Sequence, residues 1–380
     1  LKSPMAERPP LRLSELHLYS VPVSLKTRWM FLVGRSIDGL TGFGEVTLQN
    51  QETAILNATR ELPRVVTDAT LQTLQQRLPV PVGYVLASAV EQVWLDIQGQ
   101  EQNVSTRRLV EIEPRSKILC YANINRGTID RTPNSFATRA EAALAVGFSA
   151  VKIAPFDEVL AQATNQHGRA DAIDIGMARV EAVMRVSEDH PVQVDCHSRF
   201  QLNEANHIIA RLAQLGTQWI EEPVAEIAET IPKLKALRAT ANRHGALLAG
   251  AEKFSGLSQF QSFIDADAYD VIMPDIRFCG GFSEAIRIAE YADLHGIQVS
   301  PHNPCGPVMA VVSAQMAACL PSLHSLELQH AESPLFDRLL STSHQLTLGH
   351  YELTEEPGHG ITLSTQFNEY AQKEFSQIFR

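Results

Sequence analysis

Three acidic residues occupy matching positions in three strand-like segments of the sequence. Asp195 lies in VQVDCH, Glu221 in QWIEEP and Glu252 in LAGAEKF, at intervals of 26 and 31 residues. This interval is about the length of one β-α repeat, and polar residues at the carboxyl ends of parallel strands meet at one end of a barrel. Carboxylate oxygens are the ligands that Mg²⁺ prefers. The pattern therefore predicts a magnesium site, rather than three solvated acids or three acids paired with lysine.

The next two segments on the same rhythm contribute an aspartate and a histidine. Asp275 lies in VIMPDI and His302 in VSPHNP. An aspartate that accepts a hydrogen bond from one ring nitrogen fixes the tautomer of a histidine and raises the basicity of the other nitrogen. We predict such a dyad. The alternative is that Asp275 caps a helix and His302 caps a loop.

Two further residues are candidates for proton transfer beside the metal. His197 follows Asp195 by two positions, so in an extended strand both side chains would share the face that points into the barrel. Lys152, in AVKIAPF, would point inward from an earlier strand. Burial could lower its pKa and make it an acid or base, but we favour a fixed cation that offsets the carboxylates or holds a substrate oxygen.

The remaining candidates lie near the first and last barrel strands. Arg126 ends the first of these strands, where it could contact a substrate carboxylate or be a surface residue. Glu327, His330 and Glu332 lie at the end of the last strand, where the strand register is open. We predict that one of these three, with Glu327 as the choice for contact with the substrate, completes the site.

The segments that carry these residues belong to a regular alternation of strand and helix patterns that begins near Lys117. Helical patterns such as SFATRAEAALAVG and SEAIRIAEYADLHG separate the strands and end in glycine, the usual C-terminal stop. The alternation predicts a closed parallel barrel. The eight predicted strands are 118–125, 150–156, 192–197, 218–223, 247–254, 270–276, 298–303 and 324–329.

The first part of the chain does not follow this rhythm. LRLSELHLYSVPV, TRWMFLVGRSI and GLTGFGEV are typical of antiparallel strands, and LASAVEQVWLDIQGQ is typical of a helix. Val90, Val93, Trp94 and Ile97 would form one apolar face of that helix. We predict an α+β capping domain over residues 1–115, a barrel over 116–345, and a segment over 346–380 that packs back on the capping domain.

Composition excludes several classes of function. The net charge of −11, without a basic stripe, disfavours nucleic-acid binding. The apolar runs are only strand-sized, so no transmembrane helix is predicted. No signal-peptide pattern opens the sequence, so we expect a cytoplasmic protein. The five cysteines are scattered without a C-x-x-C pair, which predicts buried, reduced thiols rather than disulfides.

Taken together, these motifs resemble the enolase superfamily and, within it, the mandelate racemase/muconate lactonizing enzyme subgroup. The similar segments are GFGEV, AVEQVWLDIQGQ, GFSAVK, QVDCHSRF, WIEEP, GAEKF, PDIRFCGG, SPHNPCGP and PGHGI. The resemblance implies an α/β fold: a modified TIM barrel, (β/α)7β-like, with an N-terminal α+β capping domain. It also implies that Asp195, Glu221 and Glu252 bind Mg²⁺, to which the substrate carboxylate is coordinated.

The D-x-H pattern of Asp195 and His197 is most similar to that of the acid-sugar dehydratases, such as galactonate dehydratase. In such enzymes, the resemblance implies, the dyad His302 removes the α-proton to give a metal-stabilised enediolate. His197 then protonates the departing β-hydroxyl, and the product is a 2-keto-3-deoxy acid. The sequence therefore predicts a hydro-lyase that acts on a small-molecule sugar acid.

Two alternatives remain. A racemase or epimerase would use the same proton abstraction, with His302 on one face of the substrate and Lys152 or His197 on the other. Racemases of this group commonly carry Lys-x-Lys on the second strand, whereas here the second position is Ala154. A binding or structural protein would keep barrel and metal without catalysis, but the retained Asp275–His302 pair disfavours it.

The resemblance also implies where specificity lies. In the family, loops of the N-terminal domain that close over the barrel mouth contact the substrate. In this chain the candidate is SLKTRWM (24–30), in which Lys26 and Arg28 could meet an anionic or hydroxylated substrate or belong to a solvated turn. Family members are commonly homo-oligomeric, so we expect a homo-oligomer by analogy.

Overall fold

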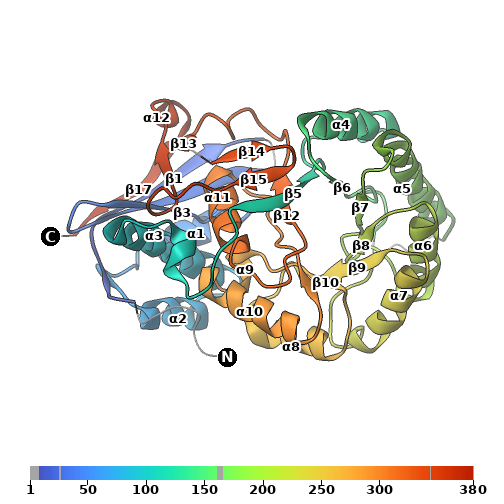
Figure 1. Ribbon diagram of the computed structural model, residues 1–380, viewed down its shortest axis with the longest axis horizontal. Coiled ribbons are helices and arrows are strands. Elements are labelled where there is room, and N and C mark those ends of the chain that lie inside the picture. The colour runs from blue at the N-terminus through green and yellow to red at the C-terminus, as the bar shows by residue number, and fades with distance from the viewer. Residues whose placement is uncertain (1–7, 25–26, 161–165, 343, 380) are drawn as a thin grey trace.

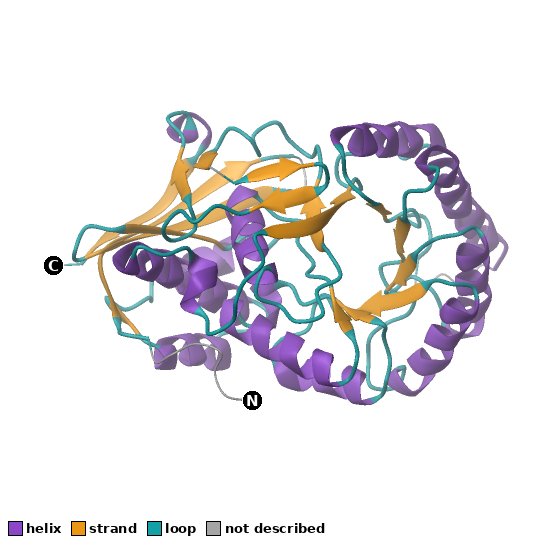
Figure 2. Ribbon diagram, viewed as in Figure 1, coloured by secondary structure: helices purple, strands orange, loops and turns teal. Residues whose placement is uncertain are grey.

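The computed structural model describes residues 8–24, 27–160, 166–342 and 344–379. A barrel of parallel strands lies beside an antiparallel sheet formed by the two ends of the chain, with helix α11 between them (Figure 1). Helices surround the barrel strands on the outside (Figure 2).

Eight parallel strands form the barrel. Neighbouring strands pair in the order β11-β10-β9-β8-β7-β6-β5-β12, and a bridge between Val299 and Leu323 connects β11 to the segment before β12. Each strand is shorter than predicted. For seven strands the predicted segment includes loop residues that follow the strand end, whereas for β12 the extra residues, 324 and 325, precede the strand. The strands are β5 (Lys117–Asn123), β6 (Val151–Ile153), β7 (Val192–Asp195), β8 (Trp219–Glu221), β9 (Leu247–Gly250), β10 (Val271–Ile272), β11 (Gln298–Val299) and β12 (Leu326–Gln329).

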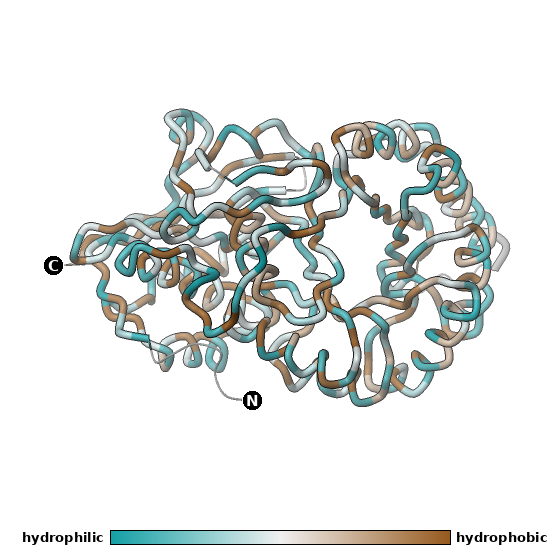
Figure 3. Tube along the Cα trace, viewed as in Figure 1, coloured by the Kyte–Doolittle hydropathy of each residue, from teal (hydrophilic) through white to brown (hydrophobic). Residues whose placement is uncertain are grey.

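Each of the first seven barrel strands is followed by helix, and β12 ends the series. In α6, Ala205, Ile208, Ile209 and Leu212 recur at helical spacing on the buried face. Brown and teal accordingly alternate along the outer helices in Figure 3. This arrangement confirms the predicted modified TIM barrel. The helices are α4 (Pro133–Val146), α5 (Gln166–Ser187), α6 (Leu202–Gln214), α7 (Ile231–Arg243), α8 (Leu257–Asp265), α9 (Ile276–Cys279), α10 (Phe282–Leu294) and α11 (Pro307–Ala317).

The N-terminal sheet has the order β17-β1-β2-β3 and packs against α3. A Cβ atom at Gly42 would lie 2.4 Å from Val93 O, and one at Gly44 would lie 2.3 Å from Ala89 O, so only glycine allows this close packing. The elements are β1 (Leu11–Pro22), β2 (Arg28–Ser36), β3 (Thr41–Glu45), α1 (Glu52–Thr59), β4 (Val65–Val66), α2 (Asp68–Arg77), α3 (Val82–Gln102) and η1 (Thr106–Leu109).

The two parts share their larger apolar core. Trp29, Phe31 and Val33 of β2 join the core cluster of the barrel, whereas Met30 and Leu32, on the other face, join a separate cluster with α3. That second cluster contains the predicted helix face Val90, Val93, Trp94 and Ile97. The five cysteines are free and buried, as predicted. No helix in the described part of the chain combines the length and the apolar character that crossing a membrane requires.

The C-terminal segment contacts both parts. Strand β15 pairs with barrel strand β5, whereas β17 pairs with β1 of the N-terminal sheet. The domain boundaries at residues 115 and 345 stay a prediction. The elements of this segment are β13 (Leu340–Thr342), β14 (Gln345–Thr347), β15 (His350–Glu352), β16 (Ile361–Leu363), α12 (Phe367–Tyr370) and β17 (Gln372–Ile378).

A buried histidine ties the PGHG turn of this segment to α3. His359 Nε2 lies 3.0 Å from Gln92 O, its Nδ1 lies 2.9 Å from Thr106 Oγ1, and its backbone N donates to Asp96 Oδ1 at 2.8 Å. Burial lowers the pKa of His359 below its ordinary value of 6.5, against the charge of Asp96. The unfolded chain therefore binds a proton near pH 6.5 that the folded protein resists.

We expect the free energy of unfolding to fall as the pH drops from about 7 to about 5.5, and to fall less in His359→Gln. The unfolded chain of this variant takes up one proton fewer, so the loss in the free energy of unfolding between the two pH values should be smaller by roughly 1 kcal/mol. Urea unfolding at the two pH values measures this. His207→Gln, at an exposed position, is the control and should leave the difference unchanged. An equal loss of stability in His359→Gln and in the unsubstituted protein would contradict the prediction.

Candidate active site

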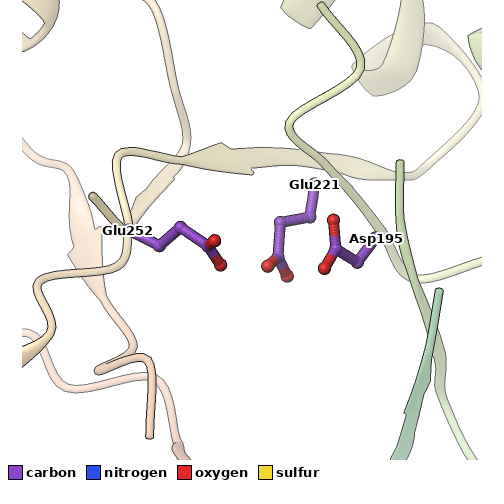
Figure 4. Close-up of side chains that lie close together, drawn as sticks. All are labelled: Asp195, Glu221 and Glu252. Atoms are coloured by element: carbon purple, nitrogen blue, oxygen red, sulfur yellow. The ribbon is translucent and has the colours of Figure 1, made fainter. Parts of the chain in front are cut away.

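Three buried carboxylates meet at the carboxyl ends of adjacent barrel strands. Asp195 ends β7 and pairs in register with Glu221, which ends β8, while Glu252 lies just beyond β9. One oxygen from each side chain lies within 4.8 Å of the others. Figure 4 shows the three carboxylates directed toward one another. Residues from three strands thus create a single cluster of negative charge.

This cluster has the chemistry of a site for a hard divalent cation. Glu252 Oε2 is buried and makes no hydrogen bond with a described residue, although His302 Nε2 lies 3.1 Å away. Burial, together with the charges of Asp195 and Glu252, raises the pKa of Glu221 well above its usual range despite nearby Lys152. A cation at this point would satisfy the free oxygen and stabilise the ionised carboxylates. The three residues therefore fit Mg²⁺.

Lys152 lies within the barrel beside this cluster. Its Nζ is 3.0 Å from Glu221 Oε1 and 3.0 Å from Glu327 Oε2, and its side chain is only 1% exposed. Burial alone would lower the pKa of Lys152, but the charges of Glu221 and Glu327 raise it well above its ordinary value. The interpretation of Lys152 as a base of lowered pKa is therefore wrong, because two buried carboxylates hold its proton.

Glu327 belongs to the layer of side chains that holds Lys152. Besides Lys152, its carboxylate accepts hydrogen bonds from Asn123 Nδ2, from Tyr121 OH at 3.3 Å and from Asn303 N at 3.3 Å. The side chain is fully buried. Its predicted contact with the substrate stays a prediction, since protein groups already engage both oxygens.

The Asp275–His302 pair has the geometry that the sequence predicts. His302 Nδ1 lies 2.8 Å from Asp275 Oδ2, and His302 Nε2 faces Glu252 of the carboxylate cluster. Asp275 also caps α9 by accepting a hydrogen bond from Arg277 N at 2.8 Å, so the two interpretations of Asp275 hold together. Burial would raise the pKa of Asp275, but the charge of Arg277 and the hydrogen bond from His302 hold it below its ordinary value.

His197 reaches the cluster in a way that the sequence argument did not foresee. Strand β7 ends at Asp195, and His197 has a φ of 48°, so the shared strand face inferred from the spacing is wrong. The left-handed turn nevertheless places Nε2 2.7 Å from Asp195 Oδ2, with the side chain 39% exposed. The charge of Asp195 raises the pKa of His197 against the effect of burial.

The last three residues of the segment predicted to contact the substrate (24–30) belong to a strand. Strand β2 begins at Arg28, whose Nη1 donates to Ser20 Oγ at 2.9 Å. Because side chains alternate along a strand, Arg28 shares the face of Met30 and not that of Trp29, which packs into the barrel core. The prediction that Arg28 lies in a loop is therefore wrong. Lys26 lies outside the described residues.

The other candidates near the strand ends have protein partners. Arg126 Nη1 lies 3.7 Å from Glu332 Oε2, and Glu332 Oε1 accepts a hydrogen bond from Thr27 of the capping domain. The His330 ring packs edge-on against Phe148, with 5.3 Å between centroids, and burial lowers its pKa. Contact of Arg126 with the substrate stays a prediction.

Two cations beside the site were missed from the sequence. Lys253 Nζ lies 2.9 Å from Glu252 Oε1 and 3.3 Å from Glu222 Oε2, with its side chain 61% exposed. Arg277 pairs with Asp275 through its guanidinium. Both follow a site residue directly or by two positions, in GAEKF and PDIRF, and this proximity was the only signal in the sequence.

Comparison with known proteins gives a consistent result. Residues 135–367 match the model of the family described as Enolase C-terminal domain-like. A D-xylonate dehydratase of Haloferax volcanii is 27% identical over 297 residues, which are 77% of this chain and 70% of that protein. A D-galactonate dehydratase of Ralstonia pickettii is 28% identical over 327 residues, covering 82% of this chain and 78% of the relative.

Solved structures share the fold over nearly the whole chain. A member of the enolase superfamily from Salmonella Typhimurium superimposes with a TM-score of 0.82 at 20% identity, over 97% of this chain and 100% of that one. A mandelate racemase/muconate lactonizing enzyme from Jannaschia sp. CCS1 gives a TM-score of 0.81 at 20% identity, over 95% and 98% of the two chains.

Proposed function

This chain belongs to the Enolase C-terminal domain-like family, and on that premise we propose that it is a Mg²⁺-dependent dehydratase of a sugar acid. The observation that carries the proposal is the meeting of the three carboxylates with His302 on one side and His197 on another. The names of the relatives, dehydratases of xylonate and galactonate, support the substrate class.

Asp195, Glu221 and Glu252 would hold the metal. When bound, Mg²⁺ supplies positive charge that favours loss of the proton next to the substrate carboxylate. Lys152 acts as a fixed cation that favours the ionised form of Glu221 and holds its side chain in place, because its Nζ contacts both oxygens of that carboxylate at 3.0 Å.

His302 is the base in this proposal. A carboxylate can only accept a hydrogen bond, so Asp275 holds the imidazole with its proton on Nδ1. The free Nε2, which faces the carboxylate cluster, is then available to take the α-proton. The dyad thus orients the base toward the place where the substrate carboxylate would bind.

His197 is the acid that completes the elimination. Cleavage of the α C–H bond gives its proton to His302, and cleavage of the β C–O bond releases the hydroxyl as water with a proton from His197. The electron pair of the C–H bond forms the enol double bond. Tautomerisation of that enol yields the 2-keto-3-deoxy acid.

A racemase or epimerase would need a second base on the opposite face of the substrate. Lys152 does not suit that role, because its ammonium is buried between Glu221 and Glu327. His197 would then have to serve as the second base. Exchange of the α-proton with solvent deuterium, without loss of the β-hydroxyl, would favour this alternative.

The direct test is a screen of the protein with Mg²⁺ against a library of mono- and diacid sugars. Formation of 2-keto-3-deoxy acids is the readout. We expect one strong substrate or a few close stereoisomers. Absence of product across the library would overturn the dehydratase proposal, and α-proton exchange in deuterium oxide would then test the epimerase.

His197→Asn should separate proton abstraction from dehydration. We expect dehydration to slow by roughly 10²–10⁴-fold, the usual contribution of a positioned acid, while α-proton exchange continues because the dyad is unchanged. Product formation and deuterium incorporation are measured on the same samples, and Mg²⁺ binding is checked by calorimetry because His197 contacts Asp195. His207→Asn, at an exposed position, is the control. An equal fall in exchange and dehydration would contradict the assignment of His197.

A further inference from the structure

Arg277 connects the dyad to the capping domain. Its Nε lies 3.0 Å from Asp275 Oδ1, and its Nη2 lies 2.5 Å from Oδ2 of the same carboxylate. Its Nη1 donates to the backbone oxygen of Thr47 at 3.2 Å, across 230 positions of the sequence. One guanidinium therefore bridges the residue that orients His302 and the segment that follows β3.

The acceptor on the capping domain is itself fixed in place. Thr47 Oγ1 accepts a hydrogen bond from Met30 N at 3.0 Å and donates one to Glu45 Oε1 at 2.8 Å. Glu45 in turn accepts hydrogen bonds from Gly306 N at 2.8 Å and Met309 N at 2.9 Å, at the start of α11. The Thr47 carbonyl thus belongs to a buried network that spans both parts of the molecule.

We propose that Arg277 is a positioning residue, which holds the Asp275 carboxylate in the plane that His302 requires and ties that plane to the capping domain. The proposal rests on the proposed function, since it concerns the base of the same reaction. Arg277 itself acts only through Asp275.

The geometry explains why arginine suits this place. Asp275 Oδ2 accepts from both Arg277 Nη2 and His302 Nδ1, so rotation of the carboxylate would break both contacts. A planar guanidinium can hold two carboxylate oxygens and use its remaining nitrogen for Thr47, whereas the point charge of lysine cannot fix that plane. The Phe278 ring, 4.6 Å from the guanidinium carbon, covers Arg277 further.

A purely structural role makes different predictions. If Arg277 only balanced the buried charge of Asp275, then Arg277→Lys would keep that balance, and folded protein would turn over at the normal rate. If Arg277 positions the dyad, loss of the two guanidinium contacts with Asp275 lowers kcat even where the positive charge is kept. The KM should change little, because Arg277 is separated from the proposed metal site by Asp275 and His302.

The experiment compares Arg277→Lys and Arg277→Met with the unsubstituted protein by kinetics and by ¹⁵N-histidine NMR. We expect kcat to fall about 10–100-fold in both variants, as for other residues that act by holding a functional side chain in place, with KM within about 3-fold. The His302 Nδ1–H signal, assigned by its loss in His302→Asn, should broaden as the proton exchanges faster with water. Normal kcat and an unchanged signal in folded Arg277→Lys would overturn the proposal, whether or not Arg277→Met folds.

Arg179 provides a matched control elsewhere in the barrel. It is also a buried arginine that holds a carboxylate with two nitrogens, at 2.6 Å each from Glu158, and donates to the backbone oxygen of Pro155. Arg179→Lys should lower the melting temperature without changing kcat or the NMR signal. The NMR readout needs no substrate. If no sugar acid is turned over, the proposed function fails, yet the signal still decides whether Arg277 positions the dyad.

Discussion

Replacing His302 with asparagine is expected to lower kcat by roughly 10²–10⁴-fold, the contribution of a positioned general base. Asparagine can still contact Asp275, but it has no nitrogen able to accept the α-proton. Because His302 is outside the set of predicted metal ligands, Mg²⁺ affinity should stay within a few-fold. Turnover of the best sugar acid and calorimetric titration with Mg²⁺ measure the two quantities.

The same variant should also stop α-proton exchange. This separates it from His197→Asn, in which exchange continues and only the elimination slows. His330→Asn is the control, since His330 follows the last barrel strand and its ring packs against Phe148. Near-normal turnover in His302→Asn, or deuterium exchange at the normal rate, would show that another group takes the proton.

The barrel could be predicted from the sequence because its β-α units recur at a regular interval. Each β-α unit places a strand end about one repeat after the previous one, so Asp195, Glu221 and Glu252 could be assigned to the same end without any coordinates. Local patterns also predicted the buried face of α3, because Val90 and Val93 recur at helical spacing. These features depend on residues that are close in sequence.

The features that were missed depend on the places where strands end or on distant partners. The prediction that Asp195 and His197 share a strand face was wrong because β7 ends at Asp195. The prediction that Arg28 lies in a loop was wrong because β2 begins there. Lys152 lies inside the barrel beside Glu221, which agrees with the fixed cation favoured from the sequence, but its second partner, Glu327, comes from the far end of the barrel sequence and was not foreseen. A sequence pattern holds no signal for such contacts.

Arg277 is an example of a residue whose role depends on a partner distant in the sequence. Its position two residues after Asp275 was the only signal in the sequence, since its contact with the capping domain is with Thr47, 230 positions earlier. The polar network between the two parts is built from contacts between residues more than 200 positions apart in the sequence, including the contact of Glu45 with Gly306. Packing of the domains, rather than local propensity, determines these positions.

Glu221→Gln is expected to abolish Mg²⁺ binding and activity together. Glu221 lies on the strand between those of Asp195 and Glu252, and an amide offers neither the charge nor the second oxygen of the carboxylate. Changes in residues that only support metal ligands cost about 10–100-fold in affinity, so loss of a ligand should exceed roughly 100-fold. Calorimetry with Mg²⁺ measures the affinity.

The fold should survive this substitution, because Lys152 keeps its contact with Glu327 Oε2 at 3.0 Å. Mg²⁺ that binds only the folded protein raises the melting temperature, so the unsubstituted protein should gain stability on its addition while Glu221→Gln should not. Glu222→Gln makes the same chemical change one residue away and should keep the response, since Glu222 contacts Lys253 rather than the other two carboxylates. Tight Mg²⁺ binding in Glu221→Gln would mean that the carboxylates meet for another reason, such as pairing with the basic side chains beside them, which are Lys152, Lys253, His197 and His302.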